Sequence, residues 1–166
     1  MNRFFWIILI TIIIVASISG YFIYQKQKLD IVTINGKDIK VELALTQSQR
    51  EKGLSGRNYL DKNSGMLFVF PQAGNHSFWM KDTLIPLDII WLAPSLGSRA
   101  RLESEVEGMY RIVDMTTLQP QTFNNIPQYT PKSPAEYVLE VNAGFVSNNN
   151  INVGDEVIET NASPTL

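Results

Sequence analysis

The chain has 166 residues, enough for one ordinary domain and an N-terminal segment but too few for two comfortable domains. Its 14 basic and 16 acidic side chains give a net charge of −2, so the sequence has no electrostatic footprint for nucleic acid. Cysteine is absent and His76 is the one histidine, which excludes disulfides, cysteine nucleophiles and zinc sites built from several imidazoles of one chain.

The first 28 residues are predicted to hold a membrane anchor. The segment from Phe4 to Tyr24 is apolar almost throughout and carries no charged side chain. Its length of roughly 20 residues matches the hydrocarbon core of a bilayer crossed by a helix. Tyr21 and Tyr24 stand where an interfacial aromatic belt is expected. We therefore predict an N-terminal transmembrane helix, a signal-anchor and tether within residues 1–28.

A cleaved signal peptide is the alternative interpretation of the same segment. Arg3 would be its charged head, and Ser17 and Ser19 the small residues before a cut ahead of Gly20. The apolar run resumes after Gly20, which favours the uncleaved anchor. The domain is extracytoplasmic in both cases, anchored to the membrane in the first and secreted in the second.

Residues 29–160 are predicted to form a single β-rich exported domain, with a loose tail over 161–166. Apolar residues alternate along 29–34 and 38–45. Asn35-Gly36 between them is the dipeptide most typical of a two-residue hairpin turn. The domain is therefore expected to begin with a β-hairpin.

A short helix is expected next, over residues 46–52. Thr46 and Gln49 stand in the relation of a capping box, and Gly53 is suited to end the helix. Later apolar runs bounded by turn residues predict strands over 65–70, 76–80, 87–92, 135–141 and 156–159, with one or two helical turns over 143–149.

Two further segments complete the pattern. Residues 99–107 and 109–118 alternate around Gly108 as the arms of a hairpin would, and 119–134 is rich in Pro, Asn, Gln and Thr, as a long surface loop would be. Many short strands separated by turns predict a mostly β (α+β) fold, a compact antiparallel barrel or sandwich with one or two short helices.

Several motifs stand in order along the exported part of the chain. They are Gly53-Leu54-Ser55-Gly56-Arg57, Gly65-Met66-Leu67-Phe68-Val69-Phe70, Ser77-Phe78-Trp79-Met80-Lys81-Asp82-Thr83, Ile85-Pro86-Leu87-Asp88, Pro134-Ala135-Glu136-Tyr137-Val138-Leu139-Glu140 and Val153-Gly154-Asp155. Together they resemble the prokaryotic family catalogued as domain of unknown function number 192, over about residues 41–159. The resemblance implies a compact, β-rich, often exported single domain and no established reaction.

Polar and aromatic side chains of these motifs suggest a binding site. Taken as extended, residues 77–83 place a tryptophan, a lysine and a threonine on one face, and two further charged residues stand nearby in the motifs. An aromatic wall with two cations and a carboxylate would bind a small anionic or sugar-like ligand. The candidate ligand-binding residues are Arg57, Trp79, Lys81, Thr83 and Asp88.

The alternative is that the aromatic residues are plain core. Asp88 is expected to return its carboxylate towards Lys81, and on this view the two form a surface pair contributing under about 1 kcal/mol. Copper ligation by His76 and Met80 would need a broken strand, because four residues of strand separate them by roughly 13 Å. We predict no metal site and no cofactor.

Three functions are consistent with these observations. The first is a membrane-anchored, small-ligand-binding or accessory module of the cell envelope. The second is an envelope hydrolase or transferase using Lys81 and Asp88, although no serine lies in a Gly-x-Ser-x-Gly elbow. The third is a protein-interaction module that docks an envelope protein through residues 119–134 or 99–118.

Overall fold

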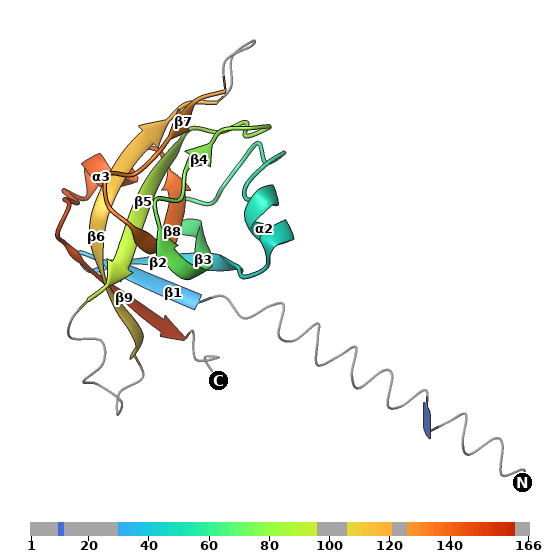
Figure 1. Ribbon diagram of the computed structural model, residues 1–166, viewed down its shortest axis with the longest axis horizontal. Helices are drawn as coiled ribbons and strands as arrows, with labels where there is room; N and C mark the ends of the chain where they lie inside the picture. The colour runs from blue at the N-terminus through green and yellow to red at the C-terminus, as the bar shows by residue number, and fades with distance from the viewer. Residues whose placement is uncertain (1–9, 12–29, 96–105, 121–125, 162–166) are drawn as a thin grey trace, which may run out of the picture.

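The computed structural model describes residues 10–11, 30–95, 106–120 and 126–161. Their strands and helices are β1 (Asp30–Ile34), β2 (Lys37–Ala44), α2 (Gln47–Lys52), β3 (Ser64–Gly74), β4 (Phe78–Trp79), β5 (Leu87–Pro94), β6 (Val106–Leu118), β7 (Gln128–Tyr129), β8 (Ala135–Asn142), α3 (Phe145–Asn148) and β9 (Glu156–Asn161). Seven strands close into a barrel in the order β1-β2-β3-β8-β5-β6-β9, and β4 pairs with β7 outside it (Figure 1). The predicted mostly β fold with two short helices is confirmed, and the barrel is the architecture found.

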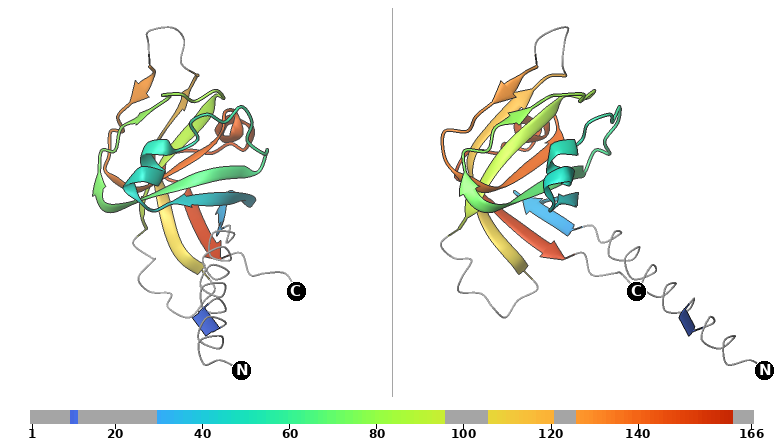
Figure 2. Two further views of the ribbon diagram at one scale, coloured as in Figure 1. Left: turned by 90° about the vertical axis from the view of Figure 1, so that its right-hand side faces the viewer. Right: turned by 45° about the vertical axis from the view of Figure 1, so that its right-hand side comes forward.

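The barrel has one parallel pair, β2 with β3, among antiparallel neighbours. Parallel neighbours need a crossover, because the chain must return to the end of the sheet from which it started. Residues 45–63 make this crossover and include α2, which lies outside the barrel wall (Figure 2). The crossover therefore covers part of the outer surface of the barrel.

Two local predictions are confirmed in detail. Asn35 and Gly36 have φ angles of 49° and 71°, the left-handed values that the predicted two-residue turn between β1 and β2 requires. At the start of α2 the Thr46 hydroxyl accepts a hydrogen bond from the backbone amide of Gln49, and Oε1 of the Gln49 side chain accepts one from the backbone amide of Thr46. Gly53 ends the helix as expected.

The barrel wall separates two apolar cores. Along β3 and β8, Leu67 and Leu139 point into the barrel, while their neighbours Phe68 and Val138 belong to a second core outside it. A strand that is buried on both faces has a continuous run of apolar residues in its sequence. For this reason apolar and polar residues do not alternate regularly along β3 and β8. We call this second core the outer core. It also contains Leu54 from the crossover.

Aromatic contacts join the small β4–β7 sheet to the outer core. The Phe78 ring meets the ring of Phe68 edge-on at 4.9 Å and that of Trp91 at 5.8 Å. The Trp91 indole donates a hydrogen bond to the His76 carbonyl at 2.8 Å. This bond fixes the residues before β4 to β5. This packing fixes β4 against the barrel beside the crossover.

The hairpin predicted around Gly108 is wrong within the described residues. Gly108 lies inside β6, which runs on to Leu118 and pairs with β5 and β9. The register with β9 shifts between Val106 and Gly108, so the glycine marks an irregularity within a strand and not a turn. Residues 99–105 of that prediction lie outside the described residues.

Two predicted segments are only partly found. The strand expected over 76–80 is reduced to the two residues of β4, because the chain turns after Met80: Asp82 has a φ of 54°, and the Thr83 amide donates to the Met80 carbonyl. The loop expected over 119–134 contains β7, which pairs with β4. Residues 121–125 lie outside the described residues.

The predicted N-terminal anchor and C-terminal tail lie almost entirely outside the described residues. Of the anchor over 1–28, the structure describes Ile10 and Thr11, and it describes no residue of the tail beyond Asn161. Among the described residues, no helix has the length and apolar character to cross a membrane.

Gly65 on β3 is a position where the fold requires glycine. A Cβ there would lie 2.5 Å from the backbone carbonyl oxygen of Glu140, which belongs to the barrel wall and cannot turn aside. We expect Gly65→Ala to lower the free energy of unfolding by about 1–3 kcal/mol, measured by urea denaturation. Gly74→Ala, on the same strand, is the control, since its nearest neighbour is the side chain of His76. Equal losses in the two variants would contradict the steric argument.

Candidate functional site

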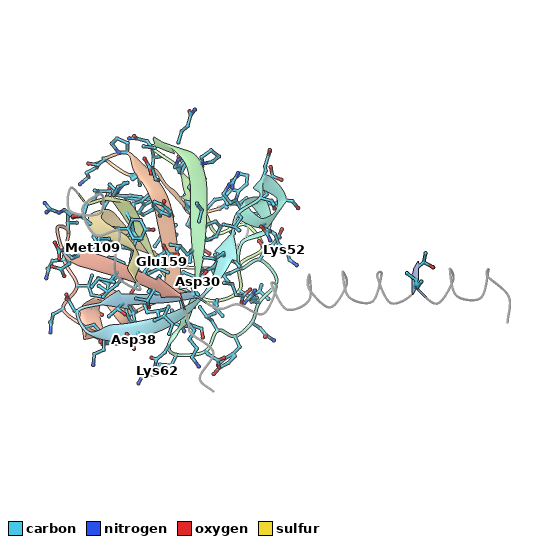
Figure 3. The ribbon with its side chains drawn as sticks, turned by 90° about the horizontal axis from the view of Figure 1, so that it is seen from below. Asp30, Asp38, Lys52, Lys62, Met109 and Glu159 are labelled. Carbon is cyan, nitrogen blue, oxygen red and sulfur yellow. The ribbon has the colours of Figure 1, made fainter. Side chains whose placement is uncertain are left out.

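A pocket of about 290 Å³ opens on the outer core, beside the crossover. It lies between α2, the residues that follow α2, and β4, and its floor is formed by β3 and β8. Viewed from below, Lys52 of α2 lies on the opposite flank of the barrel from Met109 of β6, which places the pocket away from β6 (Figure 3). Four aromatic side chains line it: Phe68, Phe70, Phe78 and Trp79.

Gly53 lets the crossover pass close over the pocket floor. Its φ of 47° and ψ of −135° are unusual for residues with a side chain. A Cβ on Gly53 would lie 3.2 Å from the ring of Phe68 and 3.8 Å from Oε2 of Glu140. The helix-ending glycine predicted from sequence therefore also brings the backbone next to the buried carboxyl group.

Glu140 of β8 lies at the floor of the pocket. Alternation along β8 puts its side chain on the face of Val138, towards the outer core, and its cross-strand neighbours are Met66 and Ile89. The residue is 5% exposed, and its Oε2 has no hydrogen-bond partner among the described residues. A buried polar atom without a partner is rare, because its lost hydration is not replaced.

Burial raises the pKa of Glu140 to about 8, and the positive charge of Arg57 opposes that rise in part. Arg57 does not neutralise this carboxyl group, because its guanidinium is bound to Glu42 on β2 through bonds of 2.5 and 2.7 Å. The hydrogen bond from Arg57 lowers the pKa of Glu42 despite partial burial. Glu140 is therefore predominantly neutral at pH 7 and its proton is available to a partner.

Cationic side chains surround the mouth of the pocket. Arg50 is held by hydrogen bonds from Nη1 to the carbonyls of Leu45, at 2.6 Å, and Val69, at 2.9 Å, and its guanidinium lies 5.3 Å from the centre of the Phe70 ring. The Lys81 ammonium lies 6.0 Å from the centre of the Trp79 ring. Aromatic faces of this kind stabilise a cation without cancelling its charge.

The turn after β4 is bound to the crossover. The Ser55 hydroxyl donates to the Lys81 carbonyl at 2.9 Å, and the Gly56 amide donates to the Asp82 carbonyl at 2.8 Å. Thr83, which is buried, also directs its hydroxyl to the Lys81 carbonyl. These bonds fix the side of the pocket that carries Lys81.

Of the five candidate residues predicted from sequence, the structure brings Trp79, Lys81 and Thr83 together around the pocket. Arg57 does not line the pocket: it is paired with Glu42, and its positive charge acts on Glu140.

Asp88 does not join the pocket, and its predicted approach to Lys81 is not found. It is 1% exposed, and its two oxygens accept hydrogen bonds from the Thr117 hydroxyl at 2.7 Å and from the Val146 amide at 2.9 Å. The second bond caps the first turn of α3. Asp88 thus ties α3 to the barrel, with both oxygens engaged.

Glu140 was missed as a site residue in the sequence. The available signal was a single carboxylate within the apolar run from Val138 to Val141. Such a run predicts a strand buried on both faces, and a charged residue inside it is buried whichever way it points.

The side chains considered for copper serve other roles. His76 stacks on Phe70 with ring centres 3.6 Å apart, and its Nε2 lies 3.0 Å from the Gln72 carbonyl. Met80 is fully buried in the outer core. Within the described ranges, no group of three or more His, Asp or Glu residues is arranged to hold a metal ion.

The raised pKa of Glu140 makes stability depend on pH. The folded state keeps the proton up to about pH 8, whereas the unfolded chain releases it near 4.5, so this stabilisation is complete below pH 4.5 and is lost as the pH rises to about 8. Glu140→Gln cannot titrate, and we expect its free energy of unfolding relative to wild type to rise by roughly 3–4 kcal/mol from pH 5 to pH 8. Urea denaturation across this range measures it. Glu136→Gln, on the same strand, is the control, and a wild-type curve parallel to that of Glu140→Gln would contradict the assignment.

Comparison with known proteins gives matches over most of the chain. The sequence profile of the family DUF192, described as an uncharacterized ACR, matches residues 30–97 and 106–158. A UPF0127 protein of Pyrococcus furiosus is 27% identical over 127 residues, which are 74% of this chain and 90% of that protein.

Two crystal structures are similar in fold. One is a candidate transcription regulator from Sinorhizobium meliloti, with a TM-score of 0.62 and 30% identity over 81% of this chain and 95% of that one. The other is a protein of unknown function from Novosphingobium aromaticivorans, with a TM-score of 0.60 and 27% identity over 78% of this chain and 82% of that one. Since the profile covers well over half of the chain, in agreement with the resemblance of its motifs, this protein belongs to the DUF192 family.

Proposed function

We propose that the barrel domain is a binding module for a small organic ligand, which sits in the pocket above Glu140. The observation that carries the proposal is the buried carboxyl group at the pocket floor, whose Oε2 lacks a partner among the described residues. Leaving such a group unsatisfied costs about 1–3 kcal/mol. A ligand that bonds to it would recover this cost on binding, which makes the position useful for recognition.

The remaining features of the pocket support the same function. A few polar groups set among aromatic walls are typical of sites for small molecules. The volume of about 290 Å³ lies just below the usual range, roughly 300–1,000 Å³, and therefore suits a small ligand. The hydrolase or transferase alternative relied on Lys81 and Asp88 acting together, and the hydrogen bonds of Asp88 give that pairing no support.

Trp79 provides a test of ligand binding. Its side chain is 53% exposed and forms a wall of the pocket, so Trp79→Ala removes contact area at little cost to the fold. In a thermal-shift screen of organic acids, nucleotides and envelope sugars, we expect some compounds to raise the melting temperature of the wild type. The same compounds should bind Trp79→Ala at least tenfold more weakly, as titration calorimetry would measure.

Tyr59→Ala is the matched control. Tyr59 is an aromatic residue 69% exposed and does not line the pocket, so its removal should leave the affinity unchanged. A screen in which no compound stabilises the wild type at millimolar concentration would contradict the proposal.

The cell-envelope location is part of the same proposal. It is supported by the uncharged apolar stretch from Phe4 to Tyr24, whose length matches a membrane span. On this view the anchor holds the binding domain at the outer surface of the membrane, where the ligand or an envelope protein partner would be met.

Membrane attachment can be tested by fractionation of cells. We expect the full chain to sediment with membranes and to resist extraction with high salt, because an inserted apolar helix is held by the hydrophobic effect and not by charge. Deletion of residues 1–28 should release the domain into the soluble fraction. Full-length protein found in the soluble fraction, with its N-terminal segment intact, would contradict the anchor.

A further inference from the structure

We infer that the ligand is a small organic acid with a flat apolar body, which accepts a hydrogen bond from Glu140 at its inner end and places its acidic group at the mouth with Arg50, Lys52 and Lys81. This inference rests on the proposed function, because it names the ligand class of the same pocket. Three parts of the site lead to it: the floor, the walls and the mouth.

The floor offers a hydrogen-bond donor. On β3 and β5 the neighbours of Glu140 are Met66 and Ile89, which carry no charge. Arg57, the cation whose charge acts on Glu140, is already paired with Glu42. A buried carboxyl group without its own counter-ion keeps its proton, because ionisation would place an uncompensated charge among apolar side chains. The inner end of the ligand must therefore present an acceptor, such as a carbonyl oxygen.

The walls select an apolar, flat body. Phe68 and Phe78 form an edge-on pair with ring centres 4.9 Å apart, and Phe70 and Trp79 complete the aromatic lining. Leu54 adds an aliphatic contact from the crossover. A strongly hydrated body, such as a sugar, would lose its water against these walls with few polar groups to replace it.

The mouth selects an anion. Arg50, Lys52 and Lys81 line it, and Glu51 is the acidic residue beside them. Within the ranges that the structure describes, the ion pair found is Arg57 with Glu42, so the three cations of the mouth have no carboxylate bound to them. The Arg50 guanidinium is fixed by backbone carbonyls, which orient it and leave its charge in place. An acidic group is therefore attracted to the mouth, and an amine is repelled.

Three probes of similar size separate these features. para-Acetylbenzoate has the acceptor and the acid, para-isopropylbenzoate has the same shape but lacks the acceptor, and para-acetylbenzylamine replaces the acid by an amine. With the full chain in detergent micelles, titration calorimetry at pH 7 should show para-acetylbenzoate binding at least tenfold more tightly than either of the others. Tighter binding of the amine, or equal binding of para-isopropylbenzoate, would overturn the inference and leave the pocket as a ligand site.

A pH series identifies the donor. The affinity for para-acetylbenzoate should be constant between pH 6 and 7 and fall by up to tenfold per unit above about pH 8, because ionised Glu140 loses its proton and repels the acceptor. Glu140→Gln keeps an N–H donor and cannot ionise, so its affinity should remain flat across the series. The same fall in Glu140→Gln, or a wild-type affinity that rises with pH, would overturn the role of Glu140.

The failure of the two proposals can be told apart. If the wider thermal-shift screen finds no stabilising compound, or if binding is unchanged in Trp79→Ala, the pocket itself is not the site and the proposed function fails with the inference. If none of the three probes binds although the screen finds a compound whose affinity depends on Trp79, only the ligand class is overturned. If binding depends on Trp79 but follows the wrong order of probes or the wrong pH profile, only the ligand class is overturned.

Discussion

A carboxyl group buried among apolar side chains without a counter-ion is the constraint on which the site depends. Glu140 is buried because the parallel pairing of β2 with β3 forces the chain to cross over the outer surface of the barrel. That crossover carries α2 and Gly53, whose backbone comes next to the carboxyl group. The same connection that joins β2 to β3 therefore makes the pocket, its cationic mouth and the dry surroundings that keep Glu140 neutral.

The outer core explains how the barrel tolerates such a group. Inside the barrel, apolar side chains such as Leu67 and Leu139 pack against one another. The outer core is a second, separate layer in which aromatic rings meet edge-on. A domain of this kind can hold one unsatisfied carboxyl group at the edge of its second core, because most of its stability comes from burial elsewhere.

The amino-acid sequence predicts this fold best where a local signal dictates the backbone conformation. Asn35-Gly36 and the capping box at Thr46 each specify dihedral angles and hydrogen bonds within a few residues, and both are found as predicted. A glycine such as Gly108 is compatible with either a turn or an irregular strand. The pairing with β9, which is distant in sequence, determines that it lies in a strand. Trp79 and Lys81 reach one pocket because they are close in sequence. The apolar run around Glu140 signals that this residue is buried, but its place at the pocket depends on the crossover, which no local pattern reveals.

Asp88 and Glu140 show why burial alone does not identify a site residue. They lie on adjacent strands, since Asp88 is paired with Val141, and both are almost fully buried. Alternation along β5 places Asp88 on the inner face with Ile90, where the Thr117 hydroxyl and an α3 amide satisfy its two oxygens. Glu140 faces the outer core and has an oxygen that no described residue satisfies. Among buried carboxyl groups, the one with unused hydrogen-bonding capacity at a pocket is the one to assign to a ligand, because the other already stabilises the fold.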